Sequence, residues 1–173
     1  MGYDTNFNGF VGIEPSITDA HRAYIVAFSR TRRMKRDAKI AETLPDPIRL
    51  AVGLPIGEEG CFFVGGSGYM GQERDASVIE HNEPPNRQPE LWCKWTVSWR
   101  GSSYVLEWNE CEKFTDYIQW MRYLVDTFFA PWGYTLNGTI EWQGEDADDR
   151  GRLIVWQRAG QRHLRPQRRD LPK

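Results

Sequence analysis

The stretch LWCKWTVSWRGSSYVLEW, residues 91–108, decides the fold because apolar and polar side chains alternate along it. Every second position of its first half is apolar, as in a strand with one buried face: Leu91, Cys93, Trp95, Val97 and Trp99. The polar run over residues 100–103 predicts a turn, and residues 104–108 return as the hairpin partner. The pattern therefore predicts an antiparallel hairpin whose buried face includes Trp95 and Trp99.

A helical signal follows the hairpin. Seven apolar residues recur at helical spacing over residues 112–129: Phe114, Tyr117, Ile118, Met121, Leu124, Val125 and Phe128. Pro131 and Gly133 end this segment. The spacing predicts one long amphipathic helix that covers one face of the sheet.

Three further strands are predicted after the helix. Residues 134–136 begin the first, and Asn137-Gly138 is the preferred two-residue hairpin turn of type I′. Residues 139–143 and 152–157 complete a three-stranded meander. Hairpin, helix and meander together predict an α+β fold with an antiparallel sheet.

The first half of the chain carries a weaker pattern. Thr18-Asp19 is a plausible helix start, followed by an apolar stripe at i, i+4, i+7 and i+8: Ala20, Tyr24, Ala27 and Phe28. An N-terminal helical segment is therefore expected. Apolar residues recur as far as Gln157, so we expect a single domain over residues 1–157 and a basic, flexible tail over residues 158–173.

Composition limits the class of protein. With 173 residues, 40% of them hydrophobic, the chain can fill one core of ordinary size. No run approaches the roughly 20 apolar residues that span a bilayer, and MGYDTNFNGF lacks the order of a signal peptide. A cytoplasmic location is expected. The three cysteines lack metal-ligand spacing and are expected to be reduced, mostly buried thiols, so we expect no metal and no cofactor: Cys61, Cys93 and Cys111.

Four segments carry a resemblance: MGYDTNFNGF, AFSRTRRMKRD, QPELWCKW and PWGYTLNGTIEWQGEDADDRGRLIV. They resemble a family of small uncharacterised proteins from bacterial genomes and their phages. The resemblance covers residues 1 to about 156, and its last segment is the most specific. It implies a bacterial or phage origin, and it implies no activity, cofactor or catalytic residue.

An acidic loop separates the last two predicted strands and contains Glu145, Asp146, Asp148 and Asp149. A calcium loop of EF-hand type that began at Asp146 would place Arg150 at position 5 and Gln157 at position 12, where oxygen ligands of the cation are required. The alternatives are a solvated hairpin loop and a docking surface for a basic partner.

Enzymatic motifs are weak. Residues 66–71 formally match G-x-G-x-x-G, but no crossover helix and parallel strand fit before the prolines at 84 and 85, so a surface loop is the simpler interpretation. His21, His81 and His163 are far apart in the sequence, and no nucleophile motif accompanies them. Glu80 and His81, in a cleft under the glycine loop 65–71, form the one enzymatic site to test.

Charge is segregated along the chain, which has a net charge of −2. Residues 30–39 and 158–173 each contain six basic residues and one acidic residue, so the remainder is strongly acidic. The basic run contains Arg30, Arg32, Arg33, Lys35 and Arg36, which would either contact phosphates or an acidic protein, or pair with the protein's own carboxylates. Trp92 and Trp120 are expected on exposed sides of their elements, where they would contribute to a binding patch.

These observations favour a non-enzymatic, cytoplasmic binding protein of bacterial or phage origin that docks a protein partner. Its expected contacts are the acidic loop, the basic run and an aromatic patch, and modulation of a host or defence protein would suit such a module. The first alternative is a nucleic-acid-binding protein that uses residues 30–39 and the tail. The second is a small enzyme with a cleft under residues 65–71. The oligomeric state is not predicted.

Overall fold

The computed structural model describes residues 3–66, 74–158 and 161–168, and the chain divides into two compact units. Unit 1 is formed by residues 1–17 and 94–173, and unit 2 by the intervening residues 18–93. The sequence predicts a single domain over residues 1–157, and the contacts group these residues into the two units. Residues 18–93 contact mainly one another, and they interrupt the chain between two strands of the same sheet.

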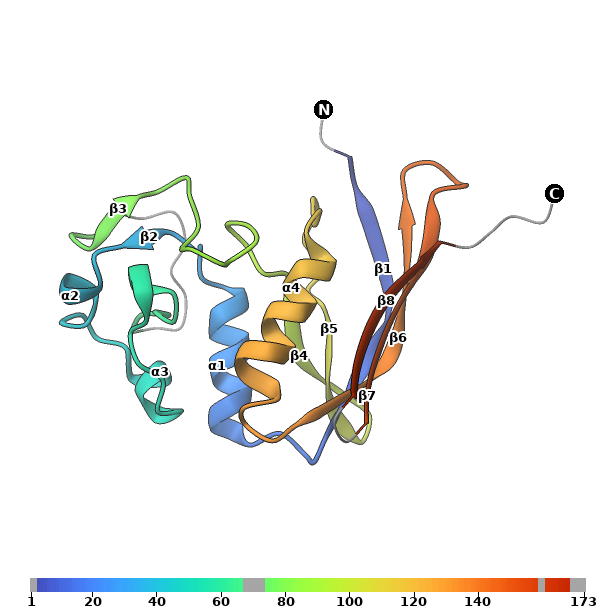
Figure 1. Cartoon of the computed structure of the whole chain (residues 1–173), viewed down its shortest axis with the longest axis horizontal. Coiled ribbons are helices and arrows are strands. Elements are labelled where there is room, and N and C mark those ends of the chain that lie inside the picture. Colours follow the sequence, from blue (N-terminus) through green and yellow to red (C-terminus); the bar gives the residue numbers. More distant parts are fainter. Residues whose placement is uncertain (1–2, 67–73, 159–160, 169–173) are drawn as a thin grey trace. The chain divides into compact units, whose positions relative to one another are not determined.

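Unit 1 contains a six-stranded sheet in which all neighbouring strands are antiparallel (Figure 1). This confirms the predicted α+β class with an antiparallel sheet. In spatial order, the strands are β4 (Trp95–Arg100), β5 (Ser103–Trp108), β1 (Thr5–Glu14), β6 (Thr135–Gly144), β7 (Arg150–Arg158) and β8 (Gln161–Arg168).

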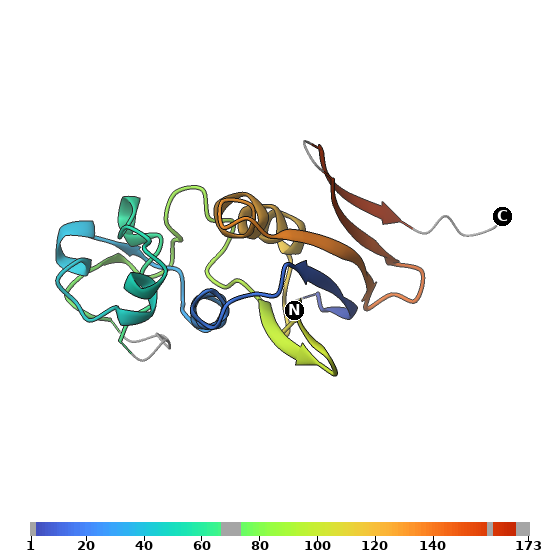
Figure 2. The same ribbon diagram turned by 90° about the horizontal axis from the view of Figure 1, so that it is seen from below.

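One helix covers one face of this sheet. Helix α4 (Tyr117–Leu124) contacts both edge strands, β4 and β8, so the sheet curves around it (Figure 2). Directly paired residues of antiparallel strands point to the same face. The face towards α4 is the apolar one and contains these buried side chains: Val11, Ile13, Trp95, Val97, Leu106, Leu136, Ile140, Trp142, Leu153 and Val155.

Strand β1 is central to the sheet, although the sequence analysis did not predict it. It pairs with β5 on one side and with β6 on the other. Its Phe7 ring lies within 5.7 Å, centroid to centroid, of four other aromatic rings, those of Trp95, Trp108, Phe114 and Tyr117. Such edge-on contacts stabilise aromatic pairs beyond the area that they bury, so Phe7 links β1, β4, β5 and α4.

The type I′ turn predicted at Asn137-Gly138 is wrong, because both residues lie inside β6. Gly138 is paired with Val11 of β1, and a Cβ added at Gly138 would lie 2.5 Å from the carbonyl oxygen of Phe10. The glycine is therefore required by the close approach of two backbones rather than by a turn. The first two predicted strands of the meander, residues 134–136 and 139–143, are therefore one strand, β6, and the third corresponds to β7.

The helix predicted over residues 112–129 begins only at Tyr117. Lys113 has a φ of 60°, which a helix does not accept, and its carbonyl accepts a hydrogen bond from Lys94 Nζ at 3.1 Å. The last part, η2 (Val125–Phe129), is a π-helix. Both Phe128 and Phe129 are buried there, an arrangement that the wider turn permits.

Strand β8 lies within the segment 158–173, for which a flexible tail was expected, and it pairs with β7 along its length. Two tryptophan predictions are also wrong. Trp120 is fully buried rather than exposed, whereas Trp99, expected in the core, is 57% exposed near the end of β4. Trp99 stands beside Tyr104, with ring centroids 5.0 Å apart, beyond the part of the sheet that carries the buried side chains.

Unit 2 has little regular structure besides its first helix. Helix α1 (Asp19–Ser29) begins at Thr18, whose Oγ1 accepts a hydrogen bond from His21 N at 3.3 Å. The other elements are short: β2 (Lys35–Arg36), α2 (Ala38–Ala41), α3 (Pro47–Ala51), the 3-10 turn η1 (Glu58–Gly60) and β3 (Val78–Glu80). No helix of the described residues in either unit has the length and apolar run needed to cross a bilayer.

Replacement of Gly138 tests the backbone contact between β1 and β6. We expect Gly138→Ala to lower the free energy of unfolding by about 1–3 kcal/mol, because the methyl group would overlap the β1 backbone. Gly12→Ala is the matched control, since its Cβ would lie 3.4 Å from its nearest neighbour and should change stability by roughly 0.5 kcal/mol or less. Urea unfolding of the two variants measures the difference, and equal effects would refute the close-approach account.

Candidate partner-binding surface

The sheet of unit 1 has a second face that no helix of unit 1 covers among the described residues. We call it the outer face and define it by the side chains of β1, β6, β7 and β8 that point away from α4. Most of them are exposed or half-buried: Asn6, Asn8, Phe10, Thr139, Glu141, Gln143, Arg150, Arg152, Ile154, Trp156, His163 and Arg165. Because one face of an antiparallel sheet is normally polar, the apolar members of this set need explanation.

Three apolar side chains lie near the middle of the outer face. Phe10 is 46% exposed, and it shares a register row with the half-buried Ile154 through Thr139. Trp156, two residues further along β7, stacks on His163 with ring centroids 5.5 Å apart and an interplanar angle of 26°. We call these three residues the apolar centre: Thr139 lies between Phe10 and Ile154 in the register, and Trp156 is the next outward residue of β7 after Ile154.

Polar residues surround this centre on the side of the β6–β7 turn. A depression of about 250 Å³ is lined there by Asn6 and Asn8 of β1, Glu141 and Gln143 of β6, and Arg150 and Arg152 of β7. Arg152 pairs with Glu141 at 3.2 Å. The Nε of Arg150 is shielded from solvent and has no hydrogen-bond acceptor in the described part of the chain.

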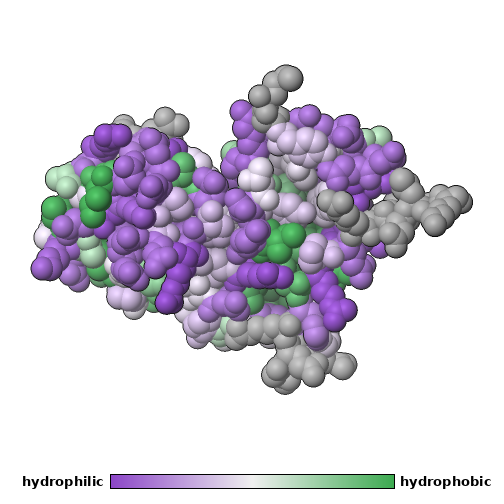
Figure 3. All heavy atoms as spheres, turned by 45° about the horizontal axis from the view of Figure 1, so that its top comes forward, coloured by the Kyte–Doolittle hydropathy of each residue, from purple (hydrophilic) through white to green (hydrophobic). Residues whose placement is uncertain are grey.

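In the described part of the chain, the other exposed large apolar side chains lie on separate elements. Leu50 and Ile79 of unit 2 are exposed on separate short elements, and Trp99 of unit 1 lies at the edge of the sheet. Figure 3 shows one face of the molecule, on which hydrophobic side chains form small separate areas within a mostly hydrophilic surface. Single exposed apolar residues are normal in proteins, so the grouping of Phe10, Ile154 and Trp156 is the informative feature.

The acidic loop is the turn between β6 and β7, at the end of the outer face. Glu145, Asp146 and Asp148 are exposed, and the half-buried Asp149 accepts a hydrogen bond from Tyr3 Oη at 2.5 Å. This bond raises the pKa of the Tyr3 hydroxyl above its ordinary value. The structure describes no group of carboxylate, histidine and cysteine side chains arranged to hold a metal ion.

The basic run belongs to unit 2 and is not a continuous basic surface. Arg30 is exposed and Lys35 half-buried, but the side chains of Arg32, Arg33 and Arg36 are buried. Arg33 is only 2% exposed and donates to the carbonyls of Phe63 and Cys61 and to Gln88 Oε1, at 3.0, 2.8 and 3.2 Å. Its guanidinium also lies 4.2 Å from the centre of the Phe28 ring.

Neighbouring arginines have internal partners as well. Arg36 pairs with Asp75 at 2.6 Å, and Arg32 donates to the His81 carbonyl at 3.1 Å. Burial raises the pKa of Asp75, but the hydrogen bonds from Ser77 and Arg36 outweigh it and hold this pKa below its ordinary value. The nucleic-acid hypothesis thus loses the phosphate contacts that it assigned to Arg32, Arg33 and Arg36, because these guanidinium groups are occupied within unit 2.

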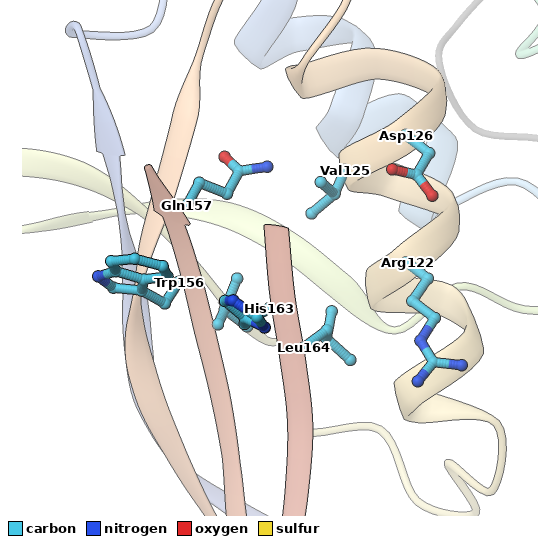
Figure 4. Close-up of a pocket in the computed structure, with 8 residues that line it drawn as sticks. Arg122, Val125, Asp126, Trp156, Gln157, His163 and Leu164 are labelled. Atoms are coloured by element: carbon cyan, nitrogen blue, oxygen red, sulfur yellow. The ribbon is translucent and has the colours of Figure 1, made fainter. Parts of the chain in front are cut away.

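A second depression, of about 290 Å³, lies between the helix and strands β7 and β8 of unit 1 (Figure 4). Val125, Val155 and Leu164 line it with apolar surface, and Arg122 and Asp126 contribute charge from the helix side. His163 also lines this depression, and its ring stacks on Trp156 with centroids 5.5 Å apart (Figure 4).

The hypothesis of a small enzyme placed its site under the glycine loop 65–71, and most of this loop lies outside the described residues. Residues 67–73 of the glycine loop lie outside the described residues. Glu80 and His81 form local contacts with Asn82: Glu80 Oε1 accepts from Asn82 N at 3.0 Å, and His81 Nδ1 is 3.1 Å from Asn82 Oδ1. Neither of the two depressions is lined by these residues.

Comparison with known proteins supplies no identification: no family model, curated protein or solved structure matches the chain. The candidate surface therefore depends on the geometry alone. Sequence reasoning found the acidic loop but not Asn6, Asn8, Phe10 or Arg150. A usable signal was present, because residues 5–14 alternate in character and their inward positions include Phe7, Val11 and Ile13.

Replacement of Arg33 tests whether the basic run is structural. We expect Arg33→Met to lower the free energy of unfolding by about 2–4 kcal/mol, because the acceptors that it satisfies would remain buried. Arg30→Met is the control, because Arg30 is exposed and the change should cost no more than about 0.5 kcal/mol. Far-UV circular dichroism in urea measures both variants. A small, equal effect at both positions would show that Arg33 is not needed for stability.

The three thiols should differ in reactivity. Cys111 is exposed, Cys61 is half-buried, and Cys93 is fully buried. Burial raises the pKa of the Cys61 thiol, although the charge of Arg33 opposes this, so less of it is thiolate near pH 8. With a chromogenic disulfide reagent we expect Cys111 to react first, Cys61 more slowly, and Cys93 only on unfolding. Cys111→Ser should remove the fast phase, and its persistence would contradict the assignment.

Proposed function

We propose that the protein is a non-enzymatic binding protein that docks a protein partner through the outer face of its six-stranded sheet. The observation that carries this proposal is the presence of Phe10, Ile154 and Trp156 on one face of the sheet, with charged and amide side chains beside them, where no described helix of unit 1 covers them. Aromatic and arginine side chains contribute most of the binding energy in protein interfaces, and a polar rim typically surrounds them.

Charge supports a protein rather than a nucleic acid as the partner. The β6–β7 turn places Glu145, Asp146 and Asp148 at one end of the outer face, and such a cluster repels a phosphate backbone. Arg150, Arg152 and Arg165 lie along β7 and β8 of the same face. A surface that carries acidic and basic side chains side by side suits a folded partner with the complementary arrangement, because complementary charges select the partner and its orientation.

The biological setting of this proposal comes from the resemblance to bacterial and phage proteins. A cytoplasmic module of bacterial or phage origin that lacks its own chemistry would act by occupying a surface of another protein. Modulation of a host or defence protein is the role that we propose for it. The acidic loop would take part as one end of the docking surface, and Arg30 and Lys35 would be secondary contacts at most.

The proposal is tested by capture from the lysate of the encoding organism, treated with nuclease, followed by affinity measurement with the captured protein. We expect Phe10→Ser to weaken binding about tenfold or more, as removal of a central aromatic contact usually does. Trp99→Ser is the matched control, because Trp99 is also an exposed aromatic side chain of the same sheet but lies off the outer face.

Both variants should first be shown to unfold at urea concentrations near that of the wild type, so that misfolding does not imitate lost binding. Unchanged affinity of Phe10→Ser together with weaker binding of Trp99→Ser would place the interface elsewhere. Recovery of nucleic acid that is lost at high salt, with no protein, would instead support the alternative of nucleic-acid binding.

A further inference from the structure

We infer that Arg150 anchors an acidic side chain of the protein partner, an aspartate or glutamate carboxylate that enters the depression on the outer face. This inference rests on the proposed function and adds to it the chemistry of one contact. Three observations support it: Arg150 pairs with no carboxylate of the described residues, the side-chain amides of Asn6 and Asn8 beside it form no hydrogen bonds there, and the acidic loop adjoins it.

Arg150 differs from the arginines of the chain that pair with a carboxylate. Among the described residues, its side chain takes part in no hydrogen bond or ion pair, and its Nε is shielded from solvent. Five other arginines each pair with a carboxylate: Arg22, Arg36, Arg49, Arg100 and Arg152. The shielded Nε shows that the side chain is held against the sheet, so the two terminal nitrogens are the donors left for a ligand.

The neighbours of Arg150 are suited to an oxygen ligand. In the strand register, Asn6 is opposite Gln143, and Gln143 is opposite Arg150, so the three side chains form one row across β1, β6 and β7. Asn8 lines the same depression from β1. Within the described residues the side chains of Asn6 and Asn8 form no hydrogen bonds, and each has an amide group that can donate to a bound carboxylate.

The charges nearby favour a singly charged acid over a phosphate. Glu141, the acid of this depression, is already neutralised by Arg152, which leaves Arg150 as the uncompensated charge. The acidic loop begins one residue before Arg150, with Asp149 and Asp148. A phosphate with nearly two negative charges would be repelled by this loop more strongly than a carboxylate, whereas one carboxylate can accept two parallel hydrogen bonds from a guanidinium.

The shape of the outer face also fits a side chain rather than a strand as the occupant. At the edge of the sheet next to this face, strand β8 contains Pro166 and exposed Arg165, and both features oppose addition of another strand. Phe10 and Ile154 are the next outward residues after Asn8 and Arg152, which line the depression, so a partner that enters the depression comes close to both. The anchor and the apolar centre would then be contacted together.

Acetate, the simplest carboxylate, is the probe for this site. We would titrate the ¹⁵N-labelled full-length protein at pH 7 with sodium acetate, with sodium chloride at equal ionic strength and with sodium phosphate, and follow the Arg150 Nε–H signal. We expect acetate alone to give a saturable shift, with half-saturation on the order of tens of millimolar, as for one small charged contact. The side-chain amides of Asn6 and Asn8 should shift with the same saturation curve.

Two variants complete the test. Arg150→Gln should abolish saturation at the Asn6 and Asn8 amides, whereas Arg165→Gln, on the same face but outside the depression, should leave it unchanged. Shifts that are linear and equal for acetate and chloride would overturn the inference. Saturation at tenfold lower phosphate than acetate would also overturn it, because the occupant would then be a phosphate group.

The same variants separate this inference from the proposed function. Phe10→Ser could weaken partner binding while Arg150→Gln changes it less than twofold and the acetate shifts do not saturate. In that case docking through the outer face is supported, and carboxylate binding by Arg150 is refuted. If acetate saturates but neither variant affects partner binding, the docking face is wrong. The inference as stated requires acetate saturation and at least tenfold weaker partner binding by Arg150→Gln.

Discussion

The fold of unit 1 depends on the insertion of β1 between β5 and β6. Without this strand the sheet would separate into the β4–β5 hairpin and the β6–β8 meander, because no other strand connects them. Two features hold β1 in place. Gly138 allows the β6 backbone to approach closely, and Phe7 packs among aromatic rings from β4, β5 and the helix region. The same strand then supplies Asn6, Asn8 and Phe10 to the opposite face, so the core and the proposed docking surface share one element.

Unit 2 has few regular helices and strands, so many of its backbone carbonyl groups need hydrogen-bond donors from side chains. Buried guanidinium groups do so: Arg33 donates to the carbonyls of Phe63 and Cys61, and Arg49 donates to the carbonyl of Leu54 while pairing with the buried Asp46. Arginine suits this role because it presents five donors in a fixed plane and keeps its charge when buried. The basic run is thus explained chiefly by internal structure, and the functional argument moves to the outer face of unit 1.

The sequence predicted the parts of the fold that depend on local patterns. The alternation around Trp95 and Val97 identified the β4–β5 hairpin, and the α+β class with an antiparallel sheet followed from the order of elements. The sequence-based prediction was wrong where tertiary contacts determine the local structure. Asn137-Gly138 is typical of a turn, but pairing with β1 holds both residues in strand β6. Charge patterning likewise could not show that Arg33 and Arg36 are buried, since internal acceptors such as the Phe63 carbonyl are supplied by distant segments. The outer face was missed because it is assembled from strands far apart in the sequence.

The central claim is that a protein partner covers the outer face of the sheet. Hydroxyl-radical footprinting of the chain, alone and with the captured partner, measures this directly, because aromatic side chains are oxidised according to their exposure. The account predicts that Phe10 and Trp156 lose reactivity in the complex while Trp99 and Leu50 keep theirs. Unchanged oxidation of Phe10 and Trp156 in a saturated complex, with protection of Trp99 or Leu50 instead, would contradict it.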